Sequence, residues 1–261
     1  MPRASLLPFL ALALAACGSR AGDRPVTPDP DPLGDGLRIR EVQAPGKAPP
    51  ASDLANASVR VTGAVITAVD TFDETRDGKS RGTIYMQDMD QAAPLSGISL
   101  FSPSFQPANL RLLAGDVVDV NGQYAEAHTI GSTVNFGANF LAQFVQPTVT
   151  FRTETTQLPK PVVIDVTDLF DFTKGRKWMG MLVTVKNVQV SPPAMNVDKN
   201  GKATGRVTAP FSGAQNAPAV SNELWDLQEN YWSDPPQSIT GIVTFFFNFK
   251  IAPRSAADIV K

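Results

Sequence analysis

The stretch Val59-Arg60-Val61-Thr62-Gly63-Ala64-Val65-Ile66-Thr67-Ala68-Val69 alternates between apolar side chains and polar or small ones. This period of two is typical of a β-strand that buries one face, because successive side chains of a strand point to opposite sides. Gly63, in the middle of the run, predicts a bulge or a sharp bend. We therefore expect the chain from residue 59 onward to be built from strands.

Further patterns of the same kind complete a small unit. Strands are expected at residues 82–88, 97–101, 118–124 and 132–145, with a short helix at 108–113. This order, together with Tyr85-Met86-Gln87-Asp88 and Leu113–Gly122, resembles the OB-fold modules that occur beside secreted bacterial nucleases and in lipoproteins. The resemblance covers about residues 59–146. It implies a small Greek-key barrel, a fold that commonly binds oligonucleotides or oligosaccharides.

A second unit, residues 178–261, follows a spacer at residues 147–177. Its first strand pattern is Trp178–Val185, and a shift in the apolar phase predicts a bulge near Lys186 and Asn187. In the spacer, Val166–Phe170 is expected to form a helical turn.

Asn200-Gly201 marks a tight hairpin turn in the second unit, and Gly241–Ile251 is the most strand-like segment of the chain. The terminal run Lys250–Ile259 resembles the closing phrase of the same OB modules. The predicted fold is therefore all-β, with two tandem OB-like Greek-key barrels. A single immunoglobulin-like sandwich with a smaller β unit is the alternative, because alternation alone does not separate a barrel from a sandwich.

Residues 17–58 are rich in proline and small polar residues. Such a composition predicts a disordered, extended and semi-rigid tether. Leu37–Val42 is an exception, because its alternating pattern predicts a short edge strand.

The beginning of the chain has the features of an export signal. Arg3 precedes an apolar run, Ala4–Ala16, of about 13 residues, which is too short for a bilayer that needs roughly 20. Leu14-Ala15-Ala16-Cys17-Gly18 resembles the lipobox of bacterial lipoproteins. The resemblance implies that residues 1–16 are a signal peptide and that Cys17 is acylated, for example with palmitate. Because no aspartate follows the cysteine, it also implies sorting to the outer membrane of a Gram-negative cell envelope. An ordinary secretory signal is the alternative.

The inventory of reactive side chains argues against catalysis. Cys17 is the only cysteine and His128 the only histidine. A lipidated cysteine supplies no disulfide or nucleophile, and one histidine does not complete a zinc site. No G-x-S-x-G motif presents a serine. We expect no enzyme activity, with a carboxylate-based hydrolase as the alternative, because the spacing of the many acidic residues in space is not readable here.

One loop contains a candidate calcium site. Asp70, Asp73 and Asp77 lie close together before Gly78, and carboxylate oxygens are the ligands that calcium requires. The spacing does not match an EF-hand, and basic residues are interspersed among the acids. A solvated loop is therefore the alternative interpretation, and no other cofactor is expected.

Charge bounds the class of ligand. The formal net charge is −2; residues 59–146 carry five basic and nine acidic residues, and residues 147–261 carry twelve and ten. Strong phosphate binding normally requires a much larger basic excess. Nucleic acid is therefore an unfavourable partner.

The second unit holds the aromatic side chains that can contact a ligand. Phe245, Phe247 and Phe249 share one face of the expected strand and are assigned to the core, whereas Phe246 shares the opposite face with Lys250.

Three further aromatic residues, Trp225, Tyr231 and Trp232, lie in a polar stretch that is expected to cap the barrel. With Phe246 and Lys250 they are the candidate ligand-binding residues. We expect a non-catalytic envelope or cell-surface lipoprotein, attached to the membrane by its lipid, whose barrels bind or scaffold a glycan or a protein partner outside the cytoplasm. An accessory nucleic-acid-binding OB module is the alternative from a different class.

Overall fold

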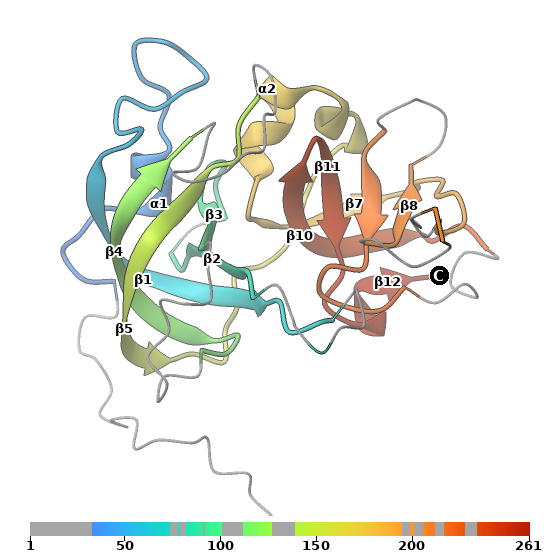
Figure 1. The fold of residues 1–261 in the computed structure, drawn as a ribbon. Coiled ribbons are helices and arrows are strands. Elements are labelled where there is room, and N and C mark those ends of the chain that lie inside the picture. The colour runs from blue at the N-terminus through green and yellow to red at the C-terminus, as the bar shows by residue number, and fades with distance from the viewer. Residues whose placement is uncertain are drawn as a thin grey trace, which may run out of the picture.

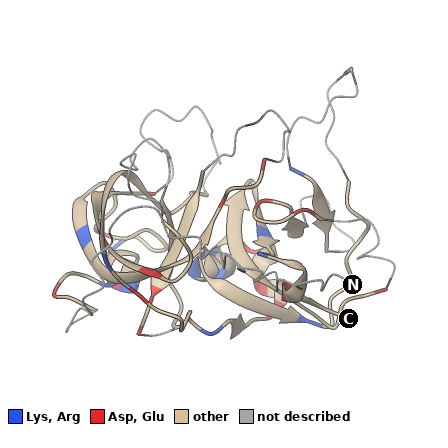
Figure 2. Cartoon of the chain, turned by 90° about the horizontal axis from the view of Figure 1, so that it is seen from below, with Lys and Arg blue, Asp and Glu red and all other residues tan. Residues whose placement is uncertain are grey.

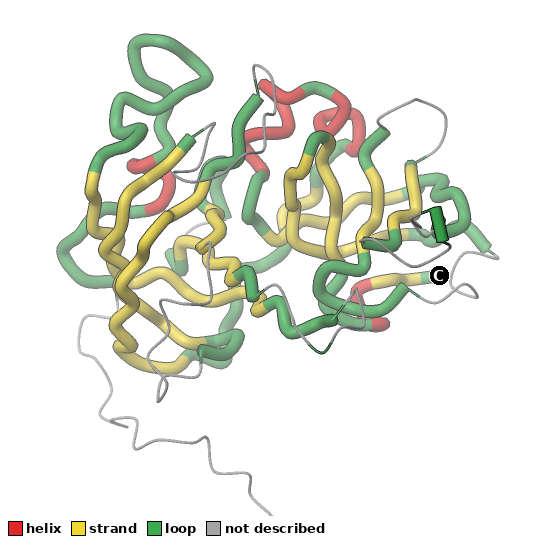
Figure 3. Tube along the Cα trace, viewed as in Figure 1, coloured by secondary structure: helices red, strands yellow, loops and turns green. Residues whose placement is uncertain are grey.

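The computed structural model describes residues 33–73, 78, 82–90, 92–100, 112–126, 139–194, 199–200, 206–211, 217–227 and 234–261. Strands dominate these residues, and the few helices are short (Figures 1 and 3). The strands form a closed barrel and a second sheet, which lie side by side (Figure 1). The expectation of a mostly β chain is therefore confirmed.

The first unit is a closed barrel made of β1 (Ser58–Val69), β2 (Ile84–Asp88), β3 (Gly97–Leu100), β4 (Asp116–Ala125) and β5 (Gln143–Glu154). The order around the barrel is β1-β2-β3-β5-β4; β3 and β5 run parallel, and the other neighbours run antiparallel. Gly63 has a φ of 65° and lies at a register shift between Val61 and Ala64, so the bulge predicted there is confirmed.

β1 is buried on both faces from Val61 to Thr67, not on one face as its alternation predicts. Neighbouring parts of the chain cover the outer face. The Thr62 Oγ1 atom accepts a hydrogen bond from the Gly36 amide at 2.8 Å. Further along the strand, Ala68 packs with Leu182 of the second unit. The sequence pattern of one strand cannot predict these contacts, because they come from distant parts of the chain.

The N-terminal segment, residues 33–57, packs against this barrel. Leu37 forms a parallel bridge with Val61, and α1 (Ile39–Val42) is a single helical turn whose two end residues are fully buried. The predicted edge strand at Leu37–Val42 is therefore wrong, and the described part of the predicted tether is a packed segment. Long-range burial of the two apolar side chains outweighs the local strand pattern.

The second unit is a sheet made of β6 (Val162–Val163), β7 (Leu182–Lys186), β8 (Thr208–Pro210), β9 (Ala219–Ser221), β10 (Ser238–Phe246), β11 (Asn248–Ala252) and β12 (Ile259–Val260). Its order is β6-β7-β10-β11-β9-β8, with β12 paired to β10 and with β9 and β11 parallel. Beyond β7 the chain bridges back to the β8 region, at Val190 with Phe211 and at Ala194 with Thr208.

The two units share a strand order. The order of neighbours β7-β10-β11-β9-β8 in the second sheet is the same as the order β1-β4-β5-β3-β2 in the barrel. The parallel pairs are at equivalent places in this order, namely β3 with β5 in the barrel and β9 with β11 in the second sheet.

The segment predicted to be one long strand, Gly241–Ile251, is a hairpin. β10 ends at Phe246 and β11 begins at Asn248, and these two residues pair directly with each other. Phe247 lies between them with a φ of 64°. Because the chain reverses there, Phe247 leaves the face that it was assigned to and is 60% exposed, whereas Phe245 and Phe249 are buried in the core as predicted.

Three short helices lie between β6 and β7 of the second unit, namely η2 (Val166–Phe170), α2 (Phe172–Gly175) and η3 (Arg176–Trp178), and η5 (Ala256–Asp258) precedes β12. The predicted helical turn at Val166–Phe170 is confirmed. Trp178 belongs to η3 and not to the following strand, and its Nε1 atom donates to the Asp168 carboxylate at 3.0 Å. β7 ends at Lys186, and the next residue, Asn187, has a φ of 53° at the predicted irregularity. The predicted helix at 108–113 and the Asn200-Gly201 turn are not fully within the described residues.

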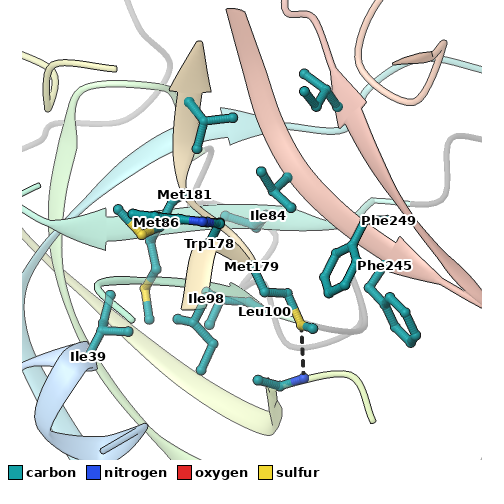
Figure 4. Close-up of a cluster of buried hydrophobic side chains, with 14 of the residues drawn as sticks. Ile39, Ile84, Met86, Ile98, Leu100, Trp178, Met179, Met181, Phe245 and Phe249 are labelled. Atoms are coloured by element: carbon teal, nitrogen blue, oxygen red, sulfur yellow. Dashed lines mark hydrogen bonds between the residues drawn. The ribbon is translucent and has the colours of Figure 1, made fainter. Parts of the chain in front are cut away.

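One hydrophobic core runs through both units. Ile84, Met86, Ile98 and Leu100 from the barrel meet Met179, Met181, Phe245 and Phe249 from the second unit, with Ile39 of α1 at the edge (Figure 4). At the junction, a Cβ atom on Gly97 of β3 would overlap the backbone of Gly180 and Met181. The two backbones touch because both positions are glycine.

Candidate functional site

The candidate site residues fall into two groups. Cys17, Asp77, His128, Tyr231 and Trp232 lie outside the described residues, so the predictions made for them stay predictions. The others are placed by the structure: Asp70, Asp73, Trp225, Phe246 and Lys250.

The β10–β11 tip, residues Phe246–Asn248, carries the most exposed aromatic side chains among the described residues. Phe246 is 51% exposed and Phe247 is 60% exposed, and their rings meet edge to face with centroids 4.9 Å apart. The left-handed conformation of Phe247 is rare for a bulky side chain and disfavours the folded state by about 1 kcal/mol or more. Backbone strain and exposed apolar side chains occur together at this turn, which makes the tip a candidate contact surface.

Lys250 stabilises this tip through hydrogen bonds. Its Nζ atom donates to the Phe246 carbonyl at 2.9 Å and to the Asn248 Oδ1 atom at 2.8 Å, with the Asn248 carbonyl at 3.4 Å. The ammonium also lies 6.0 Å from the centre of the Phe246 ring. The structure therefore brings Phe246 and Lys250 together, as the sequence predicts, but through a turn and not along one strand.

Lys250 is only 8% exposed. Burial lowers the pKa of its amine to about 8, the Glu223 carboxylate acts in the opposite direction, and the Arg206 guanidinium lowers the pKa further. A buried ammonium is stable only where acceptors surround it. The three acceptors are those of the tip, so Lys250 is a structural support for the turn and not a ligand contact.

Trp225 does not belong to this surface. Its side chain is half-buried and packs against the core. Of the two interpretations of the tryptophan, the structure therefore favours lid packing over a ligand platform.

The predicted calcium loop shows no metal-binding arrangement in its described part. Asp70 is buried and accepts from the Phe72 amide at 3.1 Å, and Asp73 accepts from the Gly78 amide at 2.7 Å. Both carboxylates thus shape the loop. Across the residues that the structure describes, no group of three or more His, Cys, Asp or Glu side chains is gathered for a metal ion.

A hollow on the barrel surface has polar walls. It measures about 560 Å³ and lies where β1, β4 and β5 meet, with polar side chains from Ser58, Arg60, Asn121, Gln123 and Gln146. A second hollow, of about 420 Å³, lies between the end of β2 and the spacer, beside Asp90 and Lys160.

The strands around the larger hollow are irregular. The pairing of β4 with β5 shifts register between Asn121 and Gln123, and Gln146 opposite has a φ of 50°. Bulges and left-handed residues of this kind are frequent beside functional surfaces. Amide side chains offer donors and acceptors together, which is the pattern that paired sugar hydroxyls require.

Sequence reasoning missed two buried polar contacts between the units. Tyr85 of β2 donates to the Glu223 carboxylate, which also pairs with Arg206; burial and the Glu223 charge raise the pKa of Tyr85. Such contacts join residues far apart in the chain, so only their positions in space reveal them.

The second contact surrounds Glu126 at the end of β4. Its carboxylate accepts from Arg176 at 2.7 Å and from the Tyr124 hydroxyl, and the Ser52 amide approaches at 3.2 Å. Arg176 also donates to the Gln43 carbonyl at 3.2 Å. The N-terminal segment, the barrel and the second unit thus meet at one buried ion pair.

Basic and acidic residues are interspersed over both units (Figure 2). The chain matches no protein-family model and none of the curated proteins. Among the described residues, no helix is long and apolar enough to cross a membrane.

Proposed function

We propose that the chain is a lipoprotein of the Gram-negative cell envelope, lipidated at Cys17, whose two tandem OB-like barrels form a non-catalytic binding or scaffold module for an extracytoplasmic glycan or protein partner. The observation that carries the proposal is the repeated strand order, with a parallel pair at the equivalent place in each unit, β3 with β5 and β9 with β11. A repeated order of this kind supports two tandem OB-like modules, and such barrels commonly serve as binding modules.

The polar hollow of the barrel is the glycan-contact surface in this proposal. Its amides and the Arg60 guanidinium, which pairs with Asp119 at 3.2 Å, surround a space large enough for a sugar ring. Interspersed charge favours a neutral or weakly charged ligand over nucleic acid.

Two experiments test the proposal separately. Metabolic labelling with palmitate should mark the wild-type chain and not a Cys17→Ser variant; equal labelling of both would contradict lipidation. Co-sedimentation with insoluble peptidoglycan or envelope polysaccharide should retain the wild-type chain and lose an Asn121→Ala, Gln146→Ala variant. Lys160→Ala, at the other hollow, is the matched control. Equal retention of all three proteins would exclude the polar hollow, and glycan turnover during the assay would contradict a non-catalytic role.

A further inference from the structure

We infer that the β10–β11 tip docks on a lipid bilayer, with Phe246 and Phe247 entering the interfacial region. The inference goes beyond the proposed ligand module, and it uses the proposed lipid anchor only to bring the protein close to the membrane. The starting observation is the pair of adjacent phenylalanines, both more than half exposed, at the end of a hairpin.

Several polar groups of the tip have hydrogen-bond partners within the protein. Lys250 donates to the carbonyls of Phe246 and Asn248, and the Asn248 Nδ2 atom donates to the Ala217 carbonyl at 2.7 Å. Backbone carbonyls that lose water without a partner oppose entry into an apolar phase. Because a buried ammonium occupies these acceptors, the tip can lose water without leaving them unpaired.

The shape of the tip also favours a bilayer over a pocket. The two rings meet at 78° and project from a turn in which Phe247 alone separates the paired residues Phe246 and Asn248. Two exposed rings need a complementary cavity in a protein partner, whereas a fluid bilayer accepts them without one. Phenylalanine has no hydroxyl or N–H group with which to bond a sugar.

The membrane is within reach of the tip. Fifteen residues separate Cys17 from Leu33, and they extend over at most about 55 Å. A compact body of the size of residues 33–261 is roughly 45 Å across. A lipid on Cys17 therefore permits any face of the folded part to turn toward the bilayer. With a net charge of −2, attraction to anionic lipid is not the driving force, so apolar insertion must supply the affinity.

The test uses residues 17–261 with Cys17→Ser, the chain without the proposed signal peptide, so its outcome is independent of the proposed anchor and an introduced cysteine is the only thiol. A Phe247→Cys variant is labelled with an environment-sensitive nitrobenzoxadiazole dye and titrated with phosphatidylcholine vesicles. We expect a blue shift and an intensity rise that saturate with lipid. Val163→Cys, at a position that is 59% exposed on β6, is the matched control and should show neither change.

Vesicle co-sedimentation supplies the second measurement. Replacing Phe246 and Phe247 with serine should weaken partitioning by about 10-fold or more, because each ring buries on the order of half its surface in the interface. A Val163→Ser, Val260→Ser variant should bind as the wild type does, and circular dichroism confirms that each variant is folded. Equal responses at positions 247 and 163, no binding at all, or binding that appears only with anionic lipid and disappears in salt would each overturn the inference.

Discussion

Lys250 illustrates how one side chain can hold a costly turn in place. A surface lysine gains little from its contacts, but this ammonium is buried and serves three acceptors of the hairpin tip. Its sequence position, two residues after the β10–β11 turn, gives no sign of this role. The alternation of Gly241–Ile251 predicts that Phe246 and Lys250 share a face. It does not predict the turn between them, which places the acceptors that Lys250 contacts.

Replacing Lys250 with methionine should lower the free energy of unfolding by about 1 to 3 kcal/mol, because the buried acceptors of the tip lose their donor. Urea unfolding of the wild type, of Lys250→Met and of Lys160→Met measures the effect; Lys160 is exposed and its replacement should change little. Equal stabilities of all three proteins would contradict the supporting role.

Asp88 provides a pH-dependent contribution to stability. Burial raises the pKa of its carboxyl to about 6, although the amides of Ile39 and Arg40, at 2.8 and 3.1 Å, and the Arg40 guanidinium act in the opposite direction. The pKa in the unfolded chain is near 3.8. Between these values Asp88 binds more protons in the folded chain than in the unfolded chain. The contribution of Asp88 to stability is therefore largest below about pH 4 and is lost as the pH rises through about 6.

The titration of Asp88 can be isolated with Asp88→Asn, which does not ionise. Relative to this variant, the wild type should lose on the order of 2 kcal/mol of unfolding free energy between about pH 4 and pH 6, with a constant difference above about pH 7. Chemical unfolding at a series of pH values measures the difference. A difference that stays flat across the whole window would show that Asp88 has an ordinary pKa.

At the level of elements, the N-terminal segment joins parts that the sequence separates. Its proline content and low periodicity predict a tether, yet Ile39 and Val42 are fully buried and Gln43 accepts from Arg176 of the second unit. The strands β1 and β4 were predictable because each carries its own alternation. α1 was not, because a four-residue helix has almost no local signal and depends on the barrel that it packs against.

The ion pair at the end of β4 should be sensitive to the loss of one partner. Glu126→Gln leaves the Arg176 charge buried without a counter-charge, and we expect it to lower the unfolding free energy by about 3 to 5 kcal/mol. Asp226→Asn, at an exposed position, is the control and should stay within about 0.5 kcal/mol of the wild type. Thermal unfolding followed by circular dichroism distinguishes the two; similar melting temperatures would argue against a tight pair.

On the scale of the whole molecule, the two units are joined by a continuous core and not by a flexible linker. The mostly β fold was predictable from the sequence. The predicted boundary at residue 146 and the predicted strand at 132–145 were not correct, because the last barrel strand, β5, runs from Gln143 to Glu154 and so continues into the predicted spacer. The junction between the units was not predictable, because nothing in the sequence distinguishes Gly97 and Gly180 from other glycines. Only the contact between their backbones in the structure shows their role. The proposed contact surfaces were predictable in part. The strand pattern indicates Phe246, whereas Phe247 and the amide-lined hollow depend on a turn and on irregular strand pairing.

Gly97→Ala should force the units apart, because its methyl group would overlap the backbone of Gly180 and Met181. We expect a loss of about 1 to 3 kcal/mol or more in unfolding free energy, and faster amide exchange at the junction, including the Leu182 amide that donates to Gln87 at 3.1 Å. Gly78→Ala, where the added methyl meets nothing within 4 Å, is a control for added volume, although its positive φ adds strain of its own. Unchanged exchange at Leu182 in Gly97→Ala would show that the junction adapts freely.

The guanidinium of Arg38 attaches the first described residues to the barrel. It donates to the Leu33 carbonyl, to the Gly34 carbonyl at 3.2 Å and to the Thr62 carbonyl at 2.7 Å, so it fastens the first described residues to β1. A force applied to the N-terminal end therefore acts on the hydrogen bonds of Arg38 before it acts on α1 or on the ion pair at Glu126. Under the proposed anchoring at Cys17, these hydrogen bonds would carry a pull on the chain before the barrel strands do.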